Sequence, residues 1–276
     1  MEALKRSIYL AATVFFIGIF SISCGSRQEG ESRAITENKE REELTARQVE
    51  DVEEYPIPTS VEVVELLQRA GAPYILGISN SPSNVDKYFT ERSKALNLGV
   101  YGADLSYAAT YEMNQDIRRY LQVCNQLVDE LNVSTTFNQD FVDRVENNLD
   151  NKDSLIYIVA ESFIDTYNYL TETRRPDLSL LVMTGSWIEG MYLTSQIAIG
   201  ARDNTEITDI ILQQDEPLEK LLSLMDDLED DTYVSSLYPG LEDIYKFLEN
   251  LESPMANDEL DAFVEKIENI RSEIIE

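Results

Sequence analysis

The 276-residue sequence contains no histidine. Without histidine the chain cannot build a Ser-His-Asp or Cys-His catalytic arrangement, a histidine-ligated zinc site, or the Glu-x-x-His metal sites of helical bundles. The sequence also lacks a Walker loop, a Gly-x-Gly-x-x-Gly segment and a Gly-x-Ser-x-Gly turn. We therefore expect no catalytic residue, no metal ligand and no cofactor. The protein is not expected to be an enzyme, although a hydrolase that uses two carboxylates alone stays an alternative.

Cysteine and basic residues are scarce. The chain has two cysteines, and its 52 acidic residues outnumber its 22 basic ones, which gives a formal net charge of −30. Nucleic-acid binding depends on neutralising phosphates with Lys and Arg, so we expect no nucleic-acid partner. Cys24 follows an apolar run near the N-terminus, whereas Cys124 lies on an apolar helical stripe. No disulfide framework is predicted, and Cys124 is expected to be buried and unreactive.

Long apolar runs are missing too. The run at residues 8–20 is about 13 residues long, shorter than the roughly 20 that a membrane-spanning helix needs. It follows Lys5 and Arg6 and ends in the small residues of Ser21-Ile22-Ser23, directly before Cys24. A charged region, an apolar region and small residues in this order predict a secretory signal.

The cysteine at this point resembles that of a bacterial lipoprotein signal. The resemblance implies that residues 1–23 are removed and that Cys24 carries the lipid, including palmitate. Ser21 stands where the pattern usually has Leu, a departure that is common in lipoproteins of Bacteroidetes. Gly25 follows the cysteine, where Asp would indicate retention at the inner membrane. The resemblance thus implies a place in the bacterial cell envelope, with the outer membrane favoured and either its periplasmic or its surface face open.

Behind the signal, composition divides the chain into two parts. Residues 24–57 are strongly charged and poor in large apolar side chains, so we predict a disordered tether. Residues 58–276 show helical periodicity and no alternating strand pattern, which predicts an all-α domain. It could be a multi-helix bundle or a stack of helix hairpins. The expected helices span 59–71, 85–96, 100–131, 137–149, 155–170, 178–199, 207–228, 234–251 and 260–275. The most apolar pair, 155–170 and 178–199, is expected at the centre.

Three carboxylates have apolar neighbours on these predicted helices: Asp104, Glu161 and Glu189. Burying an ionised carboxylate costs several kcal/mol unless it is paired or hydrogen-bonded. One interpretation is a ligand site for a cation or a small molecule, formed by these three residues with Trp187 and Tyr101. The alternative is structural, with tyrosine hydroxyls and arginines such as Arg92, Arg118 and Arg119 as partners. The residues leave both interpretations open.

Four glycines lie close to these candidates: Gly99, Gly102, Gly185 and Gly190. Gly99-Val100-Tyr101 with Asp104 is faintly echoed by Gly185-Ser186-Trp187 with Glu189. Each glycine costs a helix interior roughly 1 kcal/mol relative to alanine, so it must serve close packing or leave room for a ligand.

Segments 99–107 (GVYGADLSY) and 187–192 (WIEGMY) resemble uncharacterised helical lipoproteins of Bacteroidetes. The resemblance covers most of residues 60–275 and implies an envelope location without implying an activity. We therefore predict a membrane-anchored helical lipoprotein that acts as a binding or scaffold module. Its expected partners are the membrane, through the lipid on Cys24, and another envelope protein. The alternatives are a cation or small-ligand receptor with an internal carboxylate site and, less favoured, a hydrolase.

Overall fold

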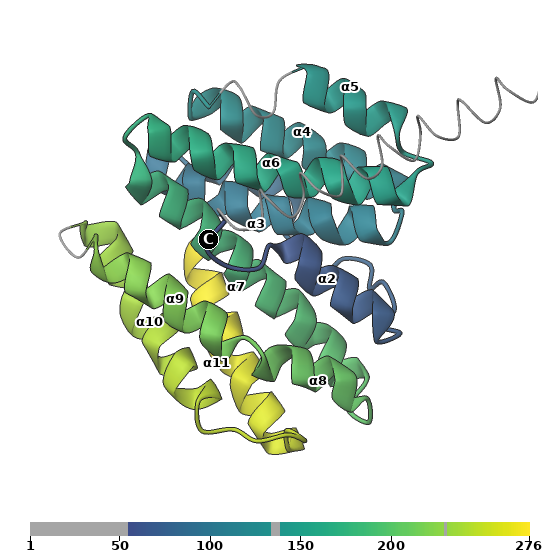
Figure 1. The fold of residues 1–276 in the computed structure, drawn as a ribbon, viewed down its shortest axis with the longest axis vertical. Coiled ribbons are helices and arrows are strands. Elements are labelled where there is room, and N and C mark those ends of the chain that lie inside the picture. Colours follow the sequence, from purple (N-terminus) through teal and green to yellow (C-terminus); the bar gives the residue numbers. More distant parts are fainter. Residues whose placement is uncertain (1–54, 134–138, 229–230) are drawn as a thin grey trace, which may run out of the picture. The chain divides into compact units, whose positions relative to one another are not determined.

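The computed structural model describes residues 55–133, 139–228 and 231–276, which belong to one compact unit of Val52–Glu276. Throughout these residues the chain is helical and contains no strand, which confirms the all-α prediction (Figure 1). The predicted signal and most of the predicted tether, residues 1–54, lie outside the described residues. None of the described helices is long and apolar enough to cross a membrane.

The helices follow one another with short connections. In chain order they are α2 (Ser60–Arg69), the 3₁₀ helix η1 (Pro82–Lys87), α3 (Glu91–Thr110), α4 (Asn114–Glu130), α5 (Gln139–Asn147), α6 (Lys152–Glu172), α7 (Pro176–Gly200), α8 (Thr205–Leu212), α9 (Asp215–Asp226), α10 (Thr232–Leu248) and α11 (Asn257–Ile275).

Helices α3 and α7 pack against each other at the centre of the fold (Figure 1). Every residue from 95 to 110 in α3 and from 178 to 191 in α7 is buried. The expectation that 155–170 would share the centre with α7 is wrong, because α6 exposes one side, including Asp165. Helix α3 takes that place. Its apolar residues are spread around the whole helix, as full burial requires.

Two glycines allow the central helices to approach closely. A Cβ atom on Gly99 would lie 2.0 Å from the carbonyl oxygen of Val182, and one on Gly185 would lie 1.9 Å from that of Leu96. Both distances are far below any van der Waals contact, so only glycine fits at either position. The two segments that echo each other in the sequence thus meet at this crossing.

The helix boundaries differ from the prediction at three points. α3 runs through Gly99 without a break, and the chain turns instead at Glu112, whose φ of 57° ends α3 before α4 begins. The expected helix 207–228 is divided into α8 and α9 at residues 213–214. The expected helix 85–96 is divided as well, since residues 85–87 belong to η1 and α3 begins at Glu91.

The folded unit also begins earlier than the predicted boundary at residue 58. Tyr55 is 8% exposed and Ile57 is 6% exposed, and both belong to the apolar core. The ring of Tyr55 packs edge-on against that of Tyr167 in α6, with centroids 5.5 Å apart. An aromatic pair of this geometry adds to the stability that burial alone provides.

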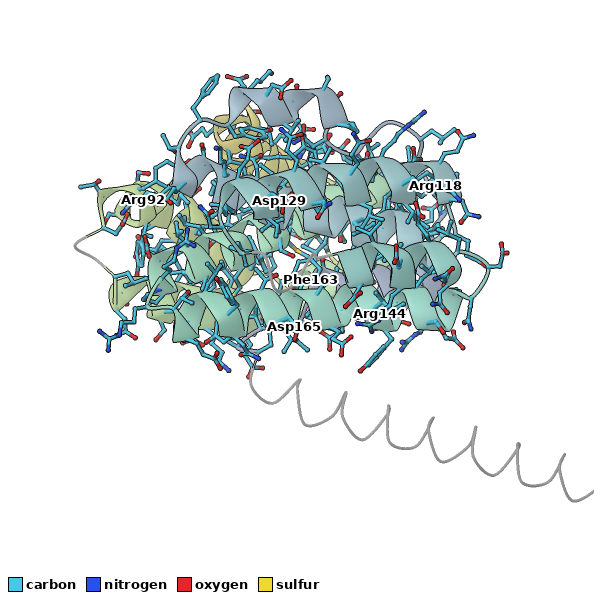
Figure 2. The ribbon with its side chains drawn as sticks, turned by 90° about the horizontal axis from the view of Figure 1, so that it is seen from above. Arg92, Arg118, Asp129, Arg144, Phe163 and Asp165 are labelled. Atoms are coloured by element: carbon cyan, nitrogen blue, oxygen red, sulfur yellow. The ribbon has the colours of Figure 1, made fainter. Side chains whose placement is uncertain are left out.

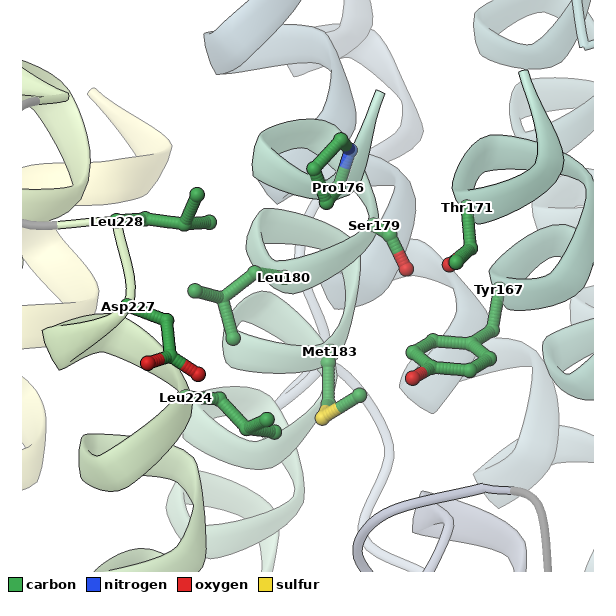
Figure 3. Close-up of a pocket in the computed structure, with 9 residues that line it drawn as sticks. All are labelled: Tyr167, Thr171, Pro176, Ser179, Leu180, Met183, Leu224, Asp227 and Leu228. Atoms are coloured by element: carbon green, nitrogen blue, oxygen red, sulfur yellow. The ribbon is translucent and has the colours of Figure 1, made fainter. Parts of the chain in front are cut away.

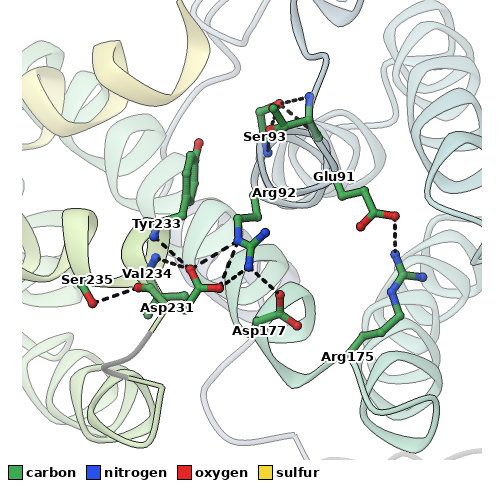
Figure 4. Close-up of polar contacts among 10 residues, drawn as sticks. Glu91, Arg92, Ser93, Arg175, Asp177, Asp231, Tyr233, Val234 and Ser235 are labelled. Carbon is green, nitrogen blue, oxygen red and sulfur yellow. Dashed lines mark hydrogen bonds and ion pairs between the residues drawn. The ribbon is translucent and has the colours of Figure 1, made fainter.

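A surface cluster joins the first turns of α3, α7 and α10 (Figure 4). Arg92 donates from Nε to Asp231 Oδ2 at 3.0 Å and lies 3.6 Å from the carboxylate of Asp177. Asp231 also caps α10 by accepting from the backbone N–H groups of Tyr233 and Val234. The hydrogen bond from Arg92 is the main cause that lowers the pKa of Asp231. Since Arg92 is exposed, we expect this cluster to orient the helix ends rather than to stabilise them strongly.

Candidate functional site

Two of the three predicted carboxylates meet in the core around one arginine. Glu189 on α7 is fully buried and accepts two hydrogen bonds from Arg271 on α11, at 2.5 Å from Nε and 2.8 Å from Nη2. The guanidinium also stacks on Tyr192, 3.8 Å from the ring centroid. This two-pronged pair is the geometry in which an arginine binds a carboxylate most strongly.

Asp104 on α3 is the second carboxylate, and it too is fully buried. Its Oδ2 accepts from the backbone N–H of Asn80 at 3.1 Å, whereas Oδ1 has no hydrogen-bond partner among the described residues. Burial and then the charge of Glu189 raise the pKa of Asp104 well above its ordinary value, against the opposing effect of Arg271. One guanidinium therefore faces two acidic groups, and the fold disfavours the charged form of Asp104 relative to water.

Tyrosines of α3 bind the loop at residues 72–90 over this end of the core. The Tyr101 hydroxyl donates to the carbonyl of Ser81 at 2.8 Å. The Tyr107 hydroxyl accepts from the N–H of Ile75 at 2.7 Å, and the Tyr111 hydroxyl donates to the carbonyl of Ala72 at 2.7 Å. The Tyr101 hydroxyl, which was predicted to contribute to a ligand site, is thus bound to the protein's own backbone.

Glu161, the third predicted carboxylate, does not join the other two. It lies on α6 with 26% of its side chain exposed and binds Arg144 at 2.5 Å. Figure 2 places Arg144 and Asp165 at the edge of the molecule, on the outer side of α6, while Arg92 and Arg118 lie at opposite ends. The predicted five-residue site is therefore not assembled as one site.

Trp187 is also separate from the carboxylates, although it is only two residues from Glu189. Two residues in a helix are about 200° apart around the axis, so Trp187 lies on the opposite side of α7. It is 5% exposed, and its Nε1 has no hydrogen-bond partner among the described residues.

The two glycines nearest the candidate residues differ in their packing. Gly190 is not tightly packed, since the nearest neighbour of an added Cβ would be Ser60 Cβ at 3.9 Å. A Cβ on Gly102, in contrast, would meet the ring of Phe163 at 2.8 Å.

The residue that the sequence prediction missed is Arg271. It was not among the expected partners Arg92, Arg118 and Arg119, because it lies far along the chain. A signal was available: Arg271 falls between Ile267 and Ile274 on the apolar stripe of α11, where a charged side chain needs a buried partner.

The polar cluster is buried, and Arg271 joins α11 to α7 through Glu189, so the cluster is suited to holding these helices together. The described residues hold no group of three or more Cys, Asp or Glu placed to bind a metal ion. Asp104 and Glu189 do not line any of the three cavities described for residues 55–276, which lie between α6, α7 and α9, between α10 and α11, and near Tyr55. The structural interpretation of the carboxylates is the one that this geometry favours.

Asp104→Asn tests the charge state of this cluster. Because the pKa of Asp104 is higher in the folded than in the unfolded chain, its contribution to stability is complete below the unfolded value and is lost as pH rises towards the folded one. The variant stays neutral and keeps an oxygen that can accept from Asn80. Its free energy of unfolding should therefore rise relative to the parent protein as pH increases above about 4.

Urea unfolding measured across the pH range checks this expectation. Asp86→Asn, in the exposed part of η1, is the matched control and should show no such pH-dependent difference. A constant difference between Asp104→Asn and the parent protein at all pH values would mean that the fold does not raise the pKa of Asp104.

The protein is thus all-α. Its two central helices, α3 and α7, cross closely at Gly99 and Gly185, and the buried ion pair of Glu189 and Arg271 joins α7 to α11. Comparisons with protein-family models, with curated proteins and with solved structures find no match to this chain. Its function is therefore inferred from its own residues.

Proposed function

We propose that the protein is a lipid-anchored helical protein of the bacterial envelope that binds or scaffolds another envelope component. The observation that carries the proposal is the N-terminal order of Lys5-Arg6, an apolar run, and Ser21-Ile22-Ser23 before Cys24. A signal of this kind followed by cysteine is what lipid attachment requires. With the lipid on Cys24, no second cysteine remains to form a disulfide with Cys124. Cys124 is buried, and burial raises the pKa of its thiol.

The segment between Cys24 and Tyr55 supports this proposal by its length and charge. At full extension its residues would reach at most about 100 Å, enough to hold a folded unit away from a bilayer. Two or more acyl chains anchor stably, whereas a single chain binds only marginally. The whole chain, with 52 acidic against 22 basic residues, is strongly negative, which disfavours its adsorption to anionic headgroups. We infer that the tether holds the folded domain away from the membrane, where a soluble partner or a neighbouring envelope protein can bind it.

A binding role is favoured over catalysis because the central ion pair and the tyrosines around it are used for the structure of the domain itself. Glu189 is held by Arg271, and the α3 tyrosines hold the loop at residues 72–90. The cavities of the described residues lie at the surface, between helices. This arrangement favours the binding of a partner protein by the outer faces of the helices.

Cys24→Ala tests the anchor. In cells fed an alkyne analogue of palmitate, the parent protein should be labelled and should partition into the detergent phase, while Cys24→Ala should lose both properties. Cys124→Ala is the matched control and should keep the label, since its sulfur is buried. Outer-membrane fractionation of the labelled protein then identifies the membrane. A parent protein without label, or a label that survives in Cys24→Ala, would overturn the proposed anchor.

A further inference from the structure

The loop at residues 72–90 is a thin cover over the buried carboxyl group of Asp104. It contains the 3₁₀ helix η1 but no α-helix, and four of its residues are buried: Ala72, Asn80, Val85 and Tyr88. A segment with few buried apolar contacts opens at a lower free energy than the helices of the core. The loop is therefore the element around Asp104 that we expect to open most easily.

Hydrogen bonds connect Asp104 to this loop and, through the loop, to the end of α11. Asp104 Oδ2 accepts from the backbone N–H of Asn80 at 3.1 Å, and the side-chain amide of Asn80 donates to the Tyr88 hydroxyl at 3.1 Å. The Tyr88 hydroxyl donates in turn to the carbonyl of Ile275 at 3.3 Å. A change at the carboxyl group of Asp104 thus acts directly on the loop.

The closed loop leaves an ionised Asp104 poorly solvated. The side chain is fully buried, and its Oδ1 has no hydrogen-bond partner among the described residues. The guanidinium of Arg271 is bound by both oxygens of Glu189. Water would relieve the cost of the buried charge, but Asp104 does not line the cavity of about 280 Å³ between α6, α7 and α9 (Figure 3). Hydration of an ionised Asp104 therefore requires part of the chain to move.

Ionisable groups from each neighbouring element surround Asp104. They are Tyr101 on α3 itself, Tyr120 and Cys124 on α4, Glu189 and Tyr192 on α7, Arg271 on α11 and Tyr88 in the loop. Burial is the main cause that raises the pKa of the tyrosines and of Cys124, so these groups stay neutral up to about pH 8. Burial lowers the pKa of Arg271, but Glu189 raises it by more, so the guanidinium stays positive. Asp104 is the acidic side chain of this set that binds the loop.

From these features we infer that the loop at residues 72–90 is a proton-controlled cover. It lies closed on α3 while the carboxyl group of Asp104 is protonated, and it separates from α3 when that group releases its proton to solvent and becomes hydrated. Opening also frees three hydroxyl groups of α3 that bind the backbone of the closed loop, those of Tyr101, Tyr107 and Tyr111. The inference does not rest on the proposed lipid anchor.

The direction of the pH dependence follows from the two states of Asp104. Its pKa is higher in the closed protein than in water, because burial and then the charge of Glu189 raise it. Closure is therefore fully stabilised below the pKa of the open form, about 4, and is weakened as pH rises towards that of the closed form. Since one proton is released, the opening equilibrium should rise by up to about ten-fold per pH unit in this interval.

Hydrogen exchange followed by mass spectrometry measures this opening in the purified full chain, kept in a non-ionic detergent. After correction for intrinsic exchange rates, the protection of the loop amides should fall by up to about ten-fold per unit between about pH 5 and 8. At each pH the loop should be at least about ten-fold less protected than α7, because it opens without unfolding of the core.

Three variants assign the effect to Asp104. Asp104→Asn keeps an oxygen for the N–H of Asn80 but cannot ionise, so its loop protection should not change with pH. Asp86→Asn is the matched control, because this exposed carboxyl group lies on the same loop, and it should keep the pH dependence of the parent protein. Tyr107→Phe removes the acceptor of the Ile75 N–H and should lower loop protection at every pH by about five- to ten-fold, with an unchanged pH dependence.

Two kinds of result would overturn the inference. The first is loop protection in the parent protein that is constant with pH, or that equals the protection of α7, because the loop would then open only when the whole protein unfolds. This comparison needs no variant, so it decides even if Asp104→Asn does not fold. The second is the same pH dependence in Asp104→Asn as in the parent protein, or its loss in Asp86→Asn.

Discussion

Arg271→Met should lower the free energy of unfolding by about 3–5 kcal/mol. The substitution leaves the fully buried carboxylate of Glu189 without the guanidinium that binds it. Methionine keeps most of the apolar stem, so the lost packing is small and the unpaired charge dominates. The effect should appear as a lower midpoint in urea unfolding followed by far-UV circular dichroism, with an unchanged slope.

Lys266→Met is the matched control, because this residue lies on the same helix and pairs with Asp243 at the surface. Its loss should cost less than about 1 kcal/mol. Replacing both Arg271 and Glu189 with methionine should recover much of the stability lost in Arg271→Met, since no buried charge remains unpaired. Equal effects of Arg271→Met and Lys266→Met would show that the buried pair contributes no more than a surface one.

Gly185→Ala should destabilise the fold by about 3 kcal/mol or more. The added methyl group would lie 1.9 Å from the carbonyl oxygen of Leu96, and backbone atoms cannot move aside without separating α3 from α7. Gly99→Ala should behave alike, because its methyl group would lie 2.0 Å from the carbonyl oxygen of Val182. Thermal or urea unfolding measures both effects.

Gly190→Ala distinguishes this clash from a general effect of alanine in α7. Its new Cβ would have Ser60 Cβ as nearest neighbour, at an ordinary contact distance of 3.9 Å. Higher helix propensity should then stabilise the protein by up to about 1 kcal/mol. A Gly185→Ala protein as stable as Gly190→Ala would mean that α3 and α7 are not in close contact.

Sequence periodicity was sufficient to predict an all-α fold, because apolar residues recur at helical spacing from α2 to α11. It was not sufficient to place the helix ends. Glu112, Asn132 and Arg174 end α3, α4 and α6 in the left-handed conformation, with φ between 55° and 62°. Glycine usually occupies this position, so a sequence with Glu or Arg there contains no signal for the end of the helix.

The candidate site was predicted only in part, for a related reason. Apolar neighbours correctly marked Asp104 and Glu189 as buried, because α3 and α7 are covered on all sides at these positions. Their partner depends on the packing of α11 against α7, and Arg271 is 82 residues away from Glu189. Glu161 has equally apolar neighbours, yet α6 lies at the surface, and only tertiary structure decides which face of a helix is covered.

Arg271 is synthesised 82 residues after Glu189, which affects the order in which the core can form. During synthesis, Glu189 leaves the ribosome well before α11 exists, so the face of α7 that α11 covers stays open to water until then. The core can therefore close around Glu189 only when α11 brings Arg271 to it. For a protein that we propose to be exported, such a delay would keep the chain unfolded for translocation and allow the core to close only on the far side of the membrane.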